Sequence, residues 1–190
     1  MAEVLVHDKV AMLMHDLGAS INDQEDLAWI LGLGFGLQYR VAATTLVNDE
    51  GSREWLKWLS VIQKTVCAKY IGEPLVAFEH QRDDLTAGDN DGGVMRAEYG
   101  SVKIVANLNA QPFIEGDTIL APYGFWAVAP NVVAAHVTAL GKTQLDKEGL
   151  SFVIESAGNS LQIWVYGLAG QEAGVAWRGE NKSPKKLVWE

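Results

Sequence analysis

The apolar residues in the first forty positions are spaced as in one strand, one loop and one helix. A short continuous apolar run covers residues 10–14 and suits a strand that is buried on both faces. The polar stretch GASINDQ follows it, and Asn22 or Asp23 can cap a helix there. The pattern predicts that this helix runs to about Tyr39.

A second helix is predicted over residues 52–72. Ser52 can cap its start and Gly72 can end it. Apolar residues recur between them at helical spacing, so the helix should pack through a face rich in tryptophan. The residues on that face are Trp55, Leu59, Ile62, Val66 and Tyr70.

The pattern changes near residue 80. After the brief apolar run at 75–79, the stretch 81–93 is rich in Asp and Gly and is typical of a turn or linker. Short runs rich in Val, Ile and aromatic residues follow, separated by Gly, Pro, Asn or Asp, as in an antiparallel β-sandwich. They are VMRAEY, VKIVANL, DTILAPY, GFWAVAP, VVAAHVTAL, LSFVIES and LQIWVYG, with LVWE as a last short strand. We therefore expect an α+β chain with a helical βα segment at 1–80, a linker at 81–93 and a β-sandwich at 94–190.

The strand predicted at 10–14 raises a question of partners. A parallel strand followed by a crossover helix exists as part of a sheet with parallel neighbours, covered on both faces. The chain offers one such strand, or two at most. The simplest explanation is that residues 1–80 are the closing portion of a larger α/β barrel and that the sandwich is the accessory domain that follows it.

At this point the chain resembles the C-terminal part of large glycoside hydrolases, which have a (β/α)8 catalytic barrel and an appended β-sandwich. The resemblance covers most of the chain and rests on MLMHDLG, DQEDLAWILGLGFGLQYRV, RAEYGSVKIVANLNAQPF and TILAPYGFWAVAP. Such sandwiches commonly carry an Asn-x-x turn and then a Pro-x-Gly-Phe corner, found here at 107–109 and 122–125.

The resemblance implies a protein that acts on carbohydrate, with the sandwich supporting the catalytic barrel. Most of the barrel is missing from this sequence, and no catalytic residue can be assigned, so we do not expect the chain to be catalytic by itself. Its partner would be carbohydrate or the missing barrel. The alternative is a non-catalytic β-sandwich module that binds carbohydrate or another protein, and a third reading is a purely structural domain.

His15 and Asp16 are the candidate substrate-binding residues. They follow the apolar run at 10–14, and barrel enzymes place their active-site groups at the carboxyl ends of strands. Asp16 could accept hydrogen bonds from sugar hydroxyls and His15 could donate one; the alternative is that both belong to an ordinary turn. Glu79 is a weaker candidate for the second carboxyl group that glycoside hydrolysis requires.

Trp164 and Tyr166 are candidates for stacking on a sugar ring. They share one face of a predicted strand, because side chains alternate with a period of two. If this face is outward, the two rings form a binding platform. The alternative is that they fill the core, where aromatic side chains contribute much of the buried area.

No cofactor and no metal are predicted. The glycines of LGLGFG lie within a helical pattern and lack a following Gly-Lys-Ser/Thr, so close helix packing explains them better than phosphate binding. The four histidines lack zinc-site spacing. The acidic turn RDDLTAGDNDGG, with Asp83, Asp84, Asp89 and Asp91, departs from the EF-hand pattern.

Composition narrows the classes further. The formal net charge of -9 gives no electrostatic reason to bind nucleic acid. The single cysteine, Cys67, excludes an intrachain disulfide. Neither a signal peptide nor a stretch long enough to span a membrane is recognised, so we expect a soluble chain without a membrane partner and leave its compartment open. A homo-oligomer formed through the apolar surface of residues 10–40 is a further expectation.

Overall fold

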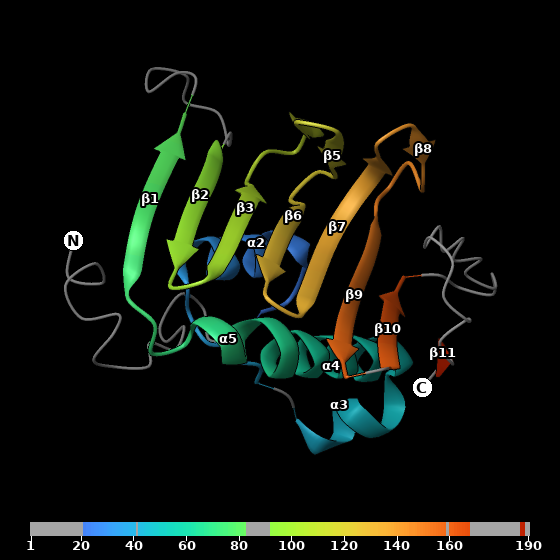
Figure 1. The fold of residues 1–190 in the computed structure, drawn as a ribbon. Helices are drawn as coiled ribbons and strands as arrows, with labels where there is room; N and C mark the ends of the chain where they lie inside the picture. Colours follow the sequence, from blue (N-terminus) through green and yellow to red (C-terminus); the bar gives the residue numbers. More distant parts are fainter. Residues whose placement is uncertain (1–20, 41, 83–91, 159, 168–186, 189–190) are drawn as a thin grey trace.

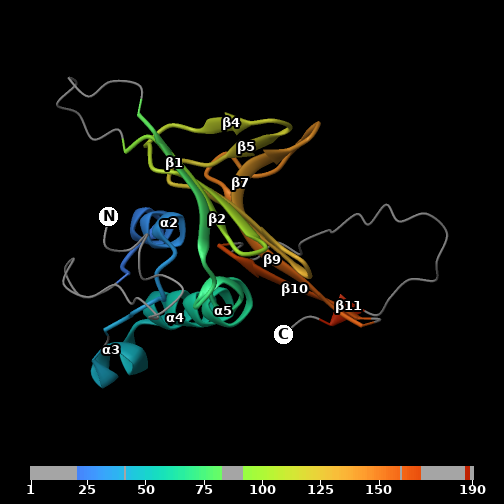
Figure 2. The same ribbon diagram turned by 60° about the vertical axis from the view of Figure 1, so that its left-hand side comes forward.

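The structure is a computed structural model of the 190-residue chain, and it describes residues 21–40, 42–82, 92–158, 160–167 and 187–188. The fold is mixed α+β, with one curled and mostly antiparallel sheet and few helices (Figure 1). Figure 2 shows helices α2 and α4 together on one side of this sheet.

The first described helix, α2 (Gln24–Leu33), confirms the predicted start and ends earlier than expected. Asp23 is its N-cap, and the Asp23 side chain accepts a hydrogen bond from the backbone N–H of Asp26 at 3.0 Å. The helix stops well before Tyr39 because Gly34 takes a left-handed conformation with φ 73°, which glycine adopts at little cost.

The second predicted helix is confirmed as a continuous helical run made of three pieces: α4 (Glu50–Ile62), the π-helical turn η1 (Gln63–Cys67) and α5 (Ala68–Tyr70). It begins slightly before Ser52, with Asp49 as the N-cap. It ends just before Gly72, as predicted. A short helix that was not predicted, α3 (Ala43–Asn48), precedes it.

The strands follow in chain order, and most coincide with the predicted runs. They are β1 (Leu75–Gln81), β2 (Val94–Tyr99), β3 (Val102–Asn107), β4 (Phe113–Glu115), β5 (Thr118–Leu120), β6 (Phe125–Ala129), β7 (Val132–Leu140), β8 (Thr143–Gln144), β9 (Leu150–Ala157), β10 (Ser160–Tyr166) and β11 (Leu187–Val188). Their order across the sheet is β1-β2-β3-β6-β7-β9-β10-β11. All these pairs are antiparallel except β10 with β11.

Strand β7 branches the sheet. Its first half pairs with β6 and β9, and its second half pairs with β5 and β8. The β4–β5 hairpin and β8 therefore lie at the end of the sheet farthest from α4 (Figure 1).

The main core lies between the helices and the sheet. A row of directly opposed residues crosses seven strands on the face toward the helices: Phe78, Ala97, Ile104, Ala127, Ala134, Val153 and Trp164. The middle five of these are buried in one cluster with Leu27 and Leu31 of α2 and with Trp58 and Ile62 of α4. The helices and the sheet are therefore joined by burial of apolar surface.

The structure tests the predicted organisation only in part. The described strands join into one connected sheet, so the second sheet of a sandwich is not found among them. The strand predicted at 10–14 lies outside the described residues. Strand β1, which precedes the predicted linker at 81–93, pairs directly with β2, which follows it. The division into 1–80 and 94–190 stays a prediction, with the added observation that both parts contribute to one core.

Candidate functional site

The candidate site is the face of the sheet that points away from α2 and α4. We call it the open face. Figure 2 shows that the described helices lie on the other side of the sheet. Two rows of directly opposed residues cross the open face. The first is Glu79, Arg96, Val105, Trp126, Ala135, Phe152 and Val165, and the second is Ala77, Glu98, Lys103, Val128, Val133, Ile154 and Ile163.

One end of the open face, on β1 to β3, is ionic. Arg96 makes a bidentate contact with Glu115 of β4, at 3.2 Å from Nε and 2.7 Å from Nη2. Its Nη1 lies 3.9 Å from a carboxylate oxygen of Glu79. The hydrogen bond with Glu115 raises the pKa of Arg96 further above its ordinary value. Arg96 therefore holds two carboxylates near one point of the sheet.

The rest of the open face, from β3 to β10, is apolar. Val105, Val133, Ile154 and Val165 are partly exposed there. The ring of Trp126 meets that of Phe152 edge to face, with centroids 6.5 Å apart. Since this face carries β-branched side chains next to a tryptophan and an ion-pair cluster, it can bind an apolar protein surface or stack on a ring with polar substituents.

A buried network fixes the end of β3 against the turn before β6. The side chain of Asn107 is excluded from solvent, and its Nδ2 donates to the carbonyls of Gln111 and Ala121, each at 2.8 Å. Its Oδ1 accepts from the N–H of Asn109 at 3.2 Å. The Tyr123 N–H donates to the Asn109 carbonyl at 3.0 Å. The Asn-x-x turn and the Pro-x-Gly-Phe corner, which carried the resemblance, are thus directly hydrogen-bonded to each other.

His136 on β7 is a second buried polar position. Its Nδ1 lies 2.8 Å from Oγ of Ser151 on β9. Burial lowers the pKa of His136 to about 4, so the ring is neutral at physiological pH. Ser151 is almost fully buried, so a substrate could not reach its hydroxyl without a change of structure. The pair is therefore better explained as a structural hydrogen bond than as a nucleophile with its base.

The predicted site residues are placed very differently. His15 and Asp16 lie outside the described residues, so their substrate-binding role stays a prediction. Glu79 lies on the open face beside Arg96. Trp164 and Tyr166 share one face, as the alternation predicts, and that face is toward the helices. The structure brings neither of these two aromatic residues to the open face.

Tyr166 packs on α4. Its ring is stacked on Trp58, with centroids 5.7 Å apart and planes 13° from parallel, and lies 5.4 Å from the ring of Trp55. Partial burial, together with the negative charge of Glu54, raises the pKa of Tyr166. The packing alternative accounts for these contacts, and the sugar-stacking role of Trp164 and Tyr166 stays a prediction.

The remaining predictions concern groups that bind ions or phosphates. Within the described ranges, no cluster of three or more His, Cys, Asp or Glu side chains could hold a metal ion. The acidic residues of the turn at 83–91 lie outside these ranges. A Cβ on Gly32 would lie 3.0 Å from Sδ of Met95 and 3.3 Å from Cβ of Ala106, so this glycine permits the close packing that was predicted.

The open-face site could not be read from the sequence. Glu79, Arg96 and Glu115 are far apart in the chain, and only the strand pairing and the position of the β4–β5 hairpin bring them together. One local signal was present, since the alternation in VMRAEY places Arg96 and Glu98 on one face. Nothing local indicated that Trp126 would lie in the same row as Arg96.

Among the described residues, no helix is long and apolar enough to cross a membrane.

Comparison with known proteins adds no identification. The chain matches no protein-family model, no curated protein and no solved structure.

Proposed function

We propose that this chain is the C-terminal supporting part of a glycoside hydrolase-like protein that acts on carbohydrate. In this proposal the sheet holds the helical segment that closes a (β/α)8 barrel. The supporting observation is the shared core, in which Leu27 of α2 and Trp58 of α4 are buried with Ile104 and Val153 of the sheet. Burial of this kind is worth roughly 1.5–3 kcal/mol for each large side chain, so it would fix the helices firmly.

The finer architecture belongs to the same proposal. The apolar part of the open face, with Val105, Val133 and Ile154, is where the second layer of a β-sandwich would pack. His15 and Asp16 would follow the last barrel strand and contact the sugar, while the remaining catalytic groups would come from the missing strands.

Two measurements test the supporting role. We expect helix melting, followed by far-ultraviolet circular dichroism, and loss of tertiary packing, followed by tryptophan fluorescence, to coincide in one transition. We also expect no turnover of chromogenic α- and β-glycosides by the purified chain. Separate transitions would contradict the shared core as a support, and turnover would show that a complete site is assembled here.

A second candidate function is carbohydrate binding on the open face. It is favoured by the partly exposed Trp126 in the same row as Arg96, since sugars stack on aromatic rings and bond to charged groups. Calorimetry with oligosaccharides tests it. Binding that is lost in Trp126→Ala and kept in Ile114→Ala, an exposed position on β4, would support this function. If the unmodified chain bound no oligosaccharide, the supporting role would be the one proposed function that remains.

A further inference from the structure

Strand β1 forms one edge of the sheet. It pairs with β2 over residues 75–81, and no other described strand pairs with it. An edge strand presents a row of backbone N–H and C=O groups that can pair with another strand. Natural edges are usually protected by lysine, proline, strong bulges or inward-pointing charges.

The protection of β1 is weak. Its sequence, LVAFEHQ, contains no lysine, arginine or proline. Its one acidic side chain, Glu79, lies 3.9 Å from Arg96 of β2, and its one register shift lies at its start, between Leu75 and Ala77. Val76 is 62% exposed and Phe78 is 44% exposed, which places both among the most exposed large apolar side chains of the described residues. Exposed apolar groups along an open strand edge favour pairing with another strand.

We propose that two copies of this chain pair through β1, so that their sheets continue antiparallel across a twofold axis. A twofold axis perpendicular to the sheet keeps each face on the same side, so residues of equal parity oppose each other. This condition leaves few registers. The register centred on Phe78 sets Phe78 against its own copy and Ala77 against Glu79, while Val76 lies at the register shift of β1, beside this paired stretch.

Charge selects between the registers. A register centred on Glu79 would set two carboxylates directly opposite each other, which is destabilising. The register centred on Phe78 sets Glu79 against an alanine and stacks two phenylalanines, a favourable cross-strand pair. The partner that fits this edge is therefore a second copy.

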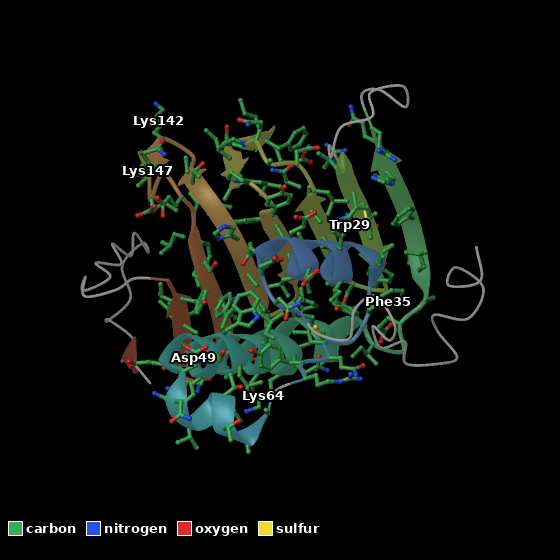
Figure 3. All side chains as sticks on the ribbon, turned by 180° about the vertical axis from the view of Figure 1, so that it is seen from behind. Trp29, Phe35, Asp49, Lys64, Lys142 and Lys147 are labelled. Carbon is green, nitrogen blue, oxygen red and sulfur yellow. The ribbon has the colours of Figure 1, made fainter. Side chains whose placement is uncertain are left out.

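The side chain of His80, two residues after Phe78, is already held in place. His80 shares the helix-side face with Phe78, and its ring meets that of Trp29 edge to face with centroids 6.0 Å apart. Figure 3 marks Trp29 on α2. His80 Nε2 also lies 2.6 Å from the carbonyl oxygen of Gly92. This end of the edge is thus rigid before pairing, which lowers the entropic cost of association.

Sedimentation of the full chain is the first test. At a chain concentration of about 50 μM we expect the sedimenting mass to approach twice that of the monomer, and we expect it to fall on dilution. Val76→Lys should return the chain to the monomer, because it places a charge on the edge. Val47→Lys is the matched control, since Val47 is 75% exposed on α3 and should leave the dimer intact. A monomeric unmodified chain, or a dimer that survives Val76→Lys, would overturn the proposal.

A cross-link tests the register. Directly opposed residues of antiparallel strands have Cα atoms about 4.5–5.5 Å apart, within the range of a disulfide. Phe78→Cys should therefore form an intermolecular disulfide under mild oxidation, whereas Val47→Cys should not. The natural Cys67 is buried and serves as the internal control, because the unmodified chain should not cross-link. Equal cross-linking of Phe78→Cys and Val47→Cys would indicate random collision and overturn the register. Because these readouts involve neither sugar nor unfolding, failure here leaves the proposed supporting role unaffected.

Discussion

The side-chain amide of Asn107 donates a hydrogen bond to the backbone carbonyl of Ala121 at 2.8 Å, in a site without solvent access. The same amide group donates to the carbonyl of Gln111, an exposed residue, at 2.8 Å, so one buried side chain joins two backbone carbonyls. The Ala121 carbonyl also accepts from the backbone N–H of Gly124 at 2.8 Å, and Oδ1 of Asn107 accepts from the N–H of Asn109 at 3.2 Å, so this one side chain ties three backbone groups together. Asn107 therefore holds the turn after β3 against the turn before β6.

We expect Asn107→Ala to lower the free energy of unfolding by about 3 kcal/mol, because it removes the hydrogen bonds that this buried side chain makes with Gln111, Ala121 and Asn109. Urea denaturation followed by circular dichroism measures the change. Asn131→Ala is the control, because Asn131 is exposed in the turn between β6 and β7 and should change stability by less than about 0.5 kcal/mol. Equal effects of the two substitutions would show that the buried network is not a main source of stability.

The stacking of Tyr166 on Trp58 predicts a graded response at Tyr166. Tyr166→Ala should lower the free energy of unfolding by about 2 kcal/mol, since it removes a half-buried ring from α4. Tyr166→Phe keeps the ring and should cost less than about 1 kcal/mol. Thermal unfolding distinguishes the two. If the phenylalanine variant were as unstable as the alanine variant, the hydroxyl rather than the ring would carry the effect.

The buried neutral His136 predicts loss of stability in mild acid. The pKa of its ring is about 4 in the folded chain and about 6.5 when unfolded, so the unfolded chain binds a proton that the folded chain does not. The stabilising contribution is complete above pH 6.5 and is lost as the pH falls from there toward 4. We expect a loss of about 2 kcal/mol between pH 7 and pH 5.

Comparison with His136→Gln isolates that effect. Glutamine can keep a hydrogen bond to Ser151 and does not titrate, so the variant should be less dependent on pH between 7 and 5. Taking the difference between the two chains cancels the other titrating groups. Parallel stability curves for the two chains would mean that His136 is not the source of the acid sensitivity.

Cys67 should be inert in the folded chain. Burial raises the pKa of its thiol to about 12, and its Sγ lies 3.1 Å from the hydroxyl of Tyr70. We expect the native chain to react with an aromatic disulfide reagent at least roughly 100-fold more slowly than the same chain in denaturant, because reaction requires opening of the core. Rapid modification of the native chain at pH 8 would place Cys67 at the surface instead.

The local pattern of residues determined the start of α2, the second helical run and most of the described strands, but neither the end of α2 nor the short helix α3. Asp23, Gly34 and Gly72 act through their own backbone and capping chemistry, and the alternation in runs such as VMRAEY is visible without any partner. For this reason the helix start, most strands and the shared face of Trp164 and Tyr166 were predictable. The end of α2 was missed because the left-handed conformation of Gly34 competes with a helical pattern that continues beyond it.

Tertiary structure decided which face became the core and where the polar side chains met. Periodicity says that Trp164 and Tyr166 lie together, but only the packing of α4 turns them toward the helices. The ion pairs of Arg96 with Glu79 and Glu115 arise from strand pairing and the β4–β5 hairpin, which depend on long-range contacts and strand register. A residue pattern carries the period of each element, whereas the choice of partner is made by the apolar area that the whole chain can bury.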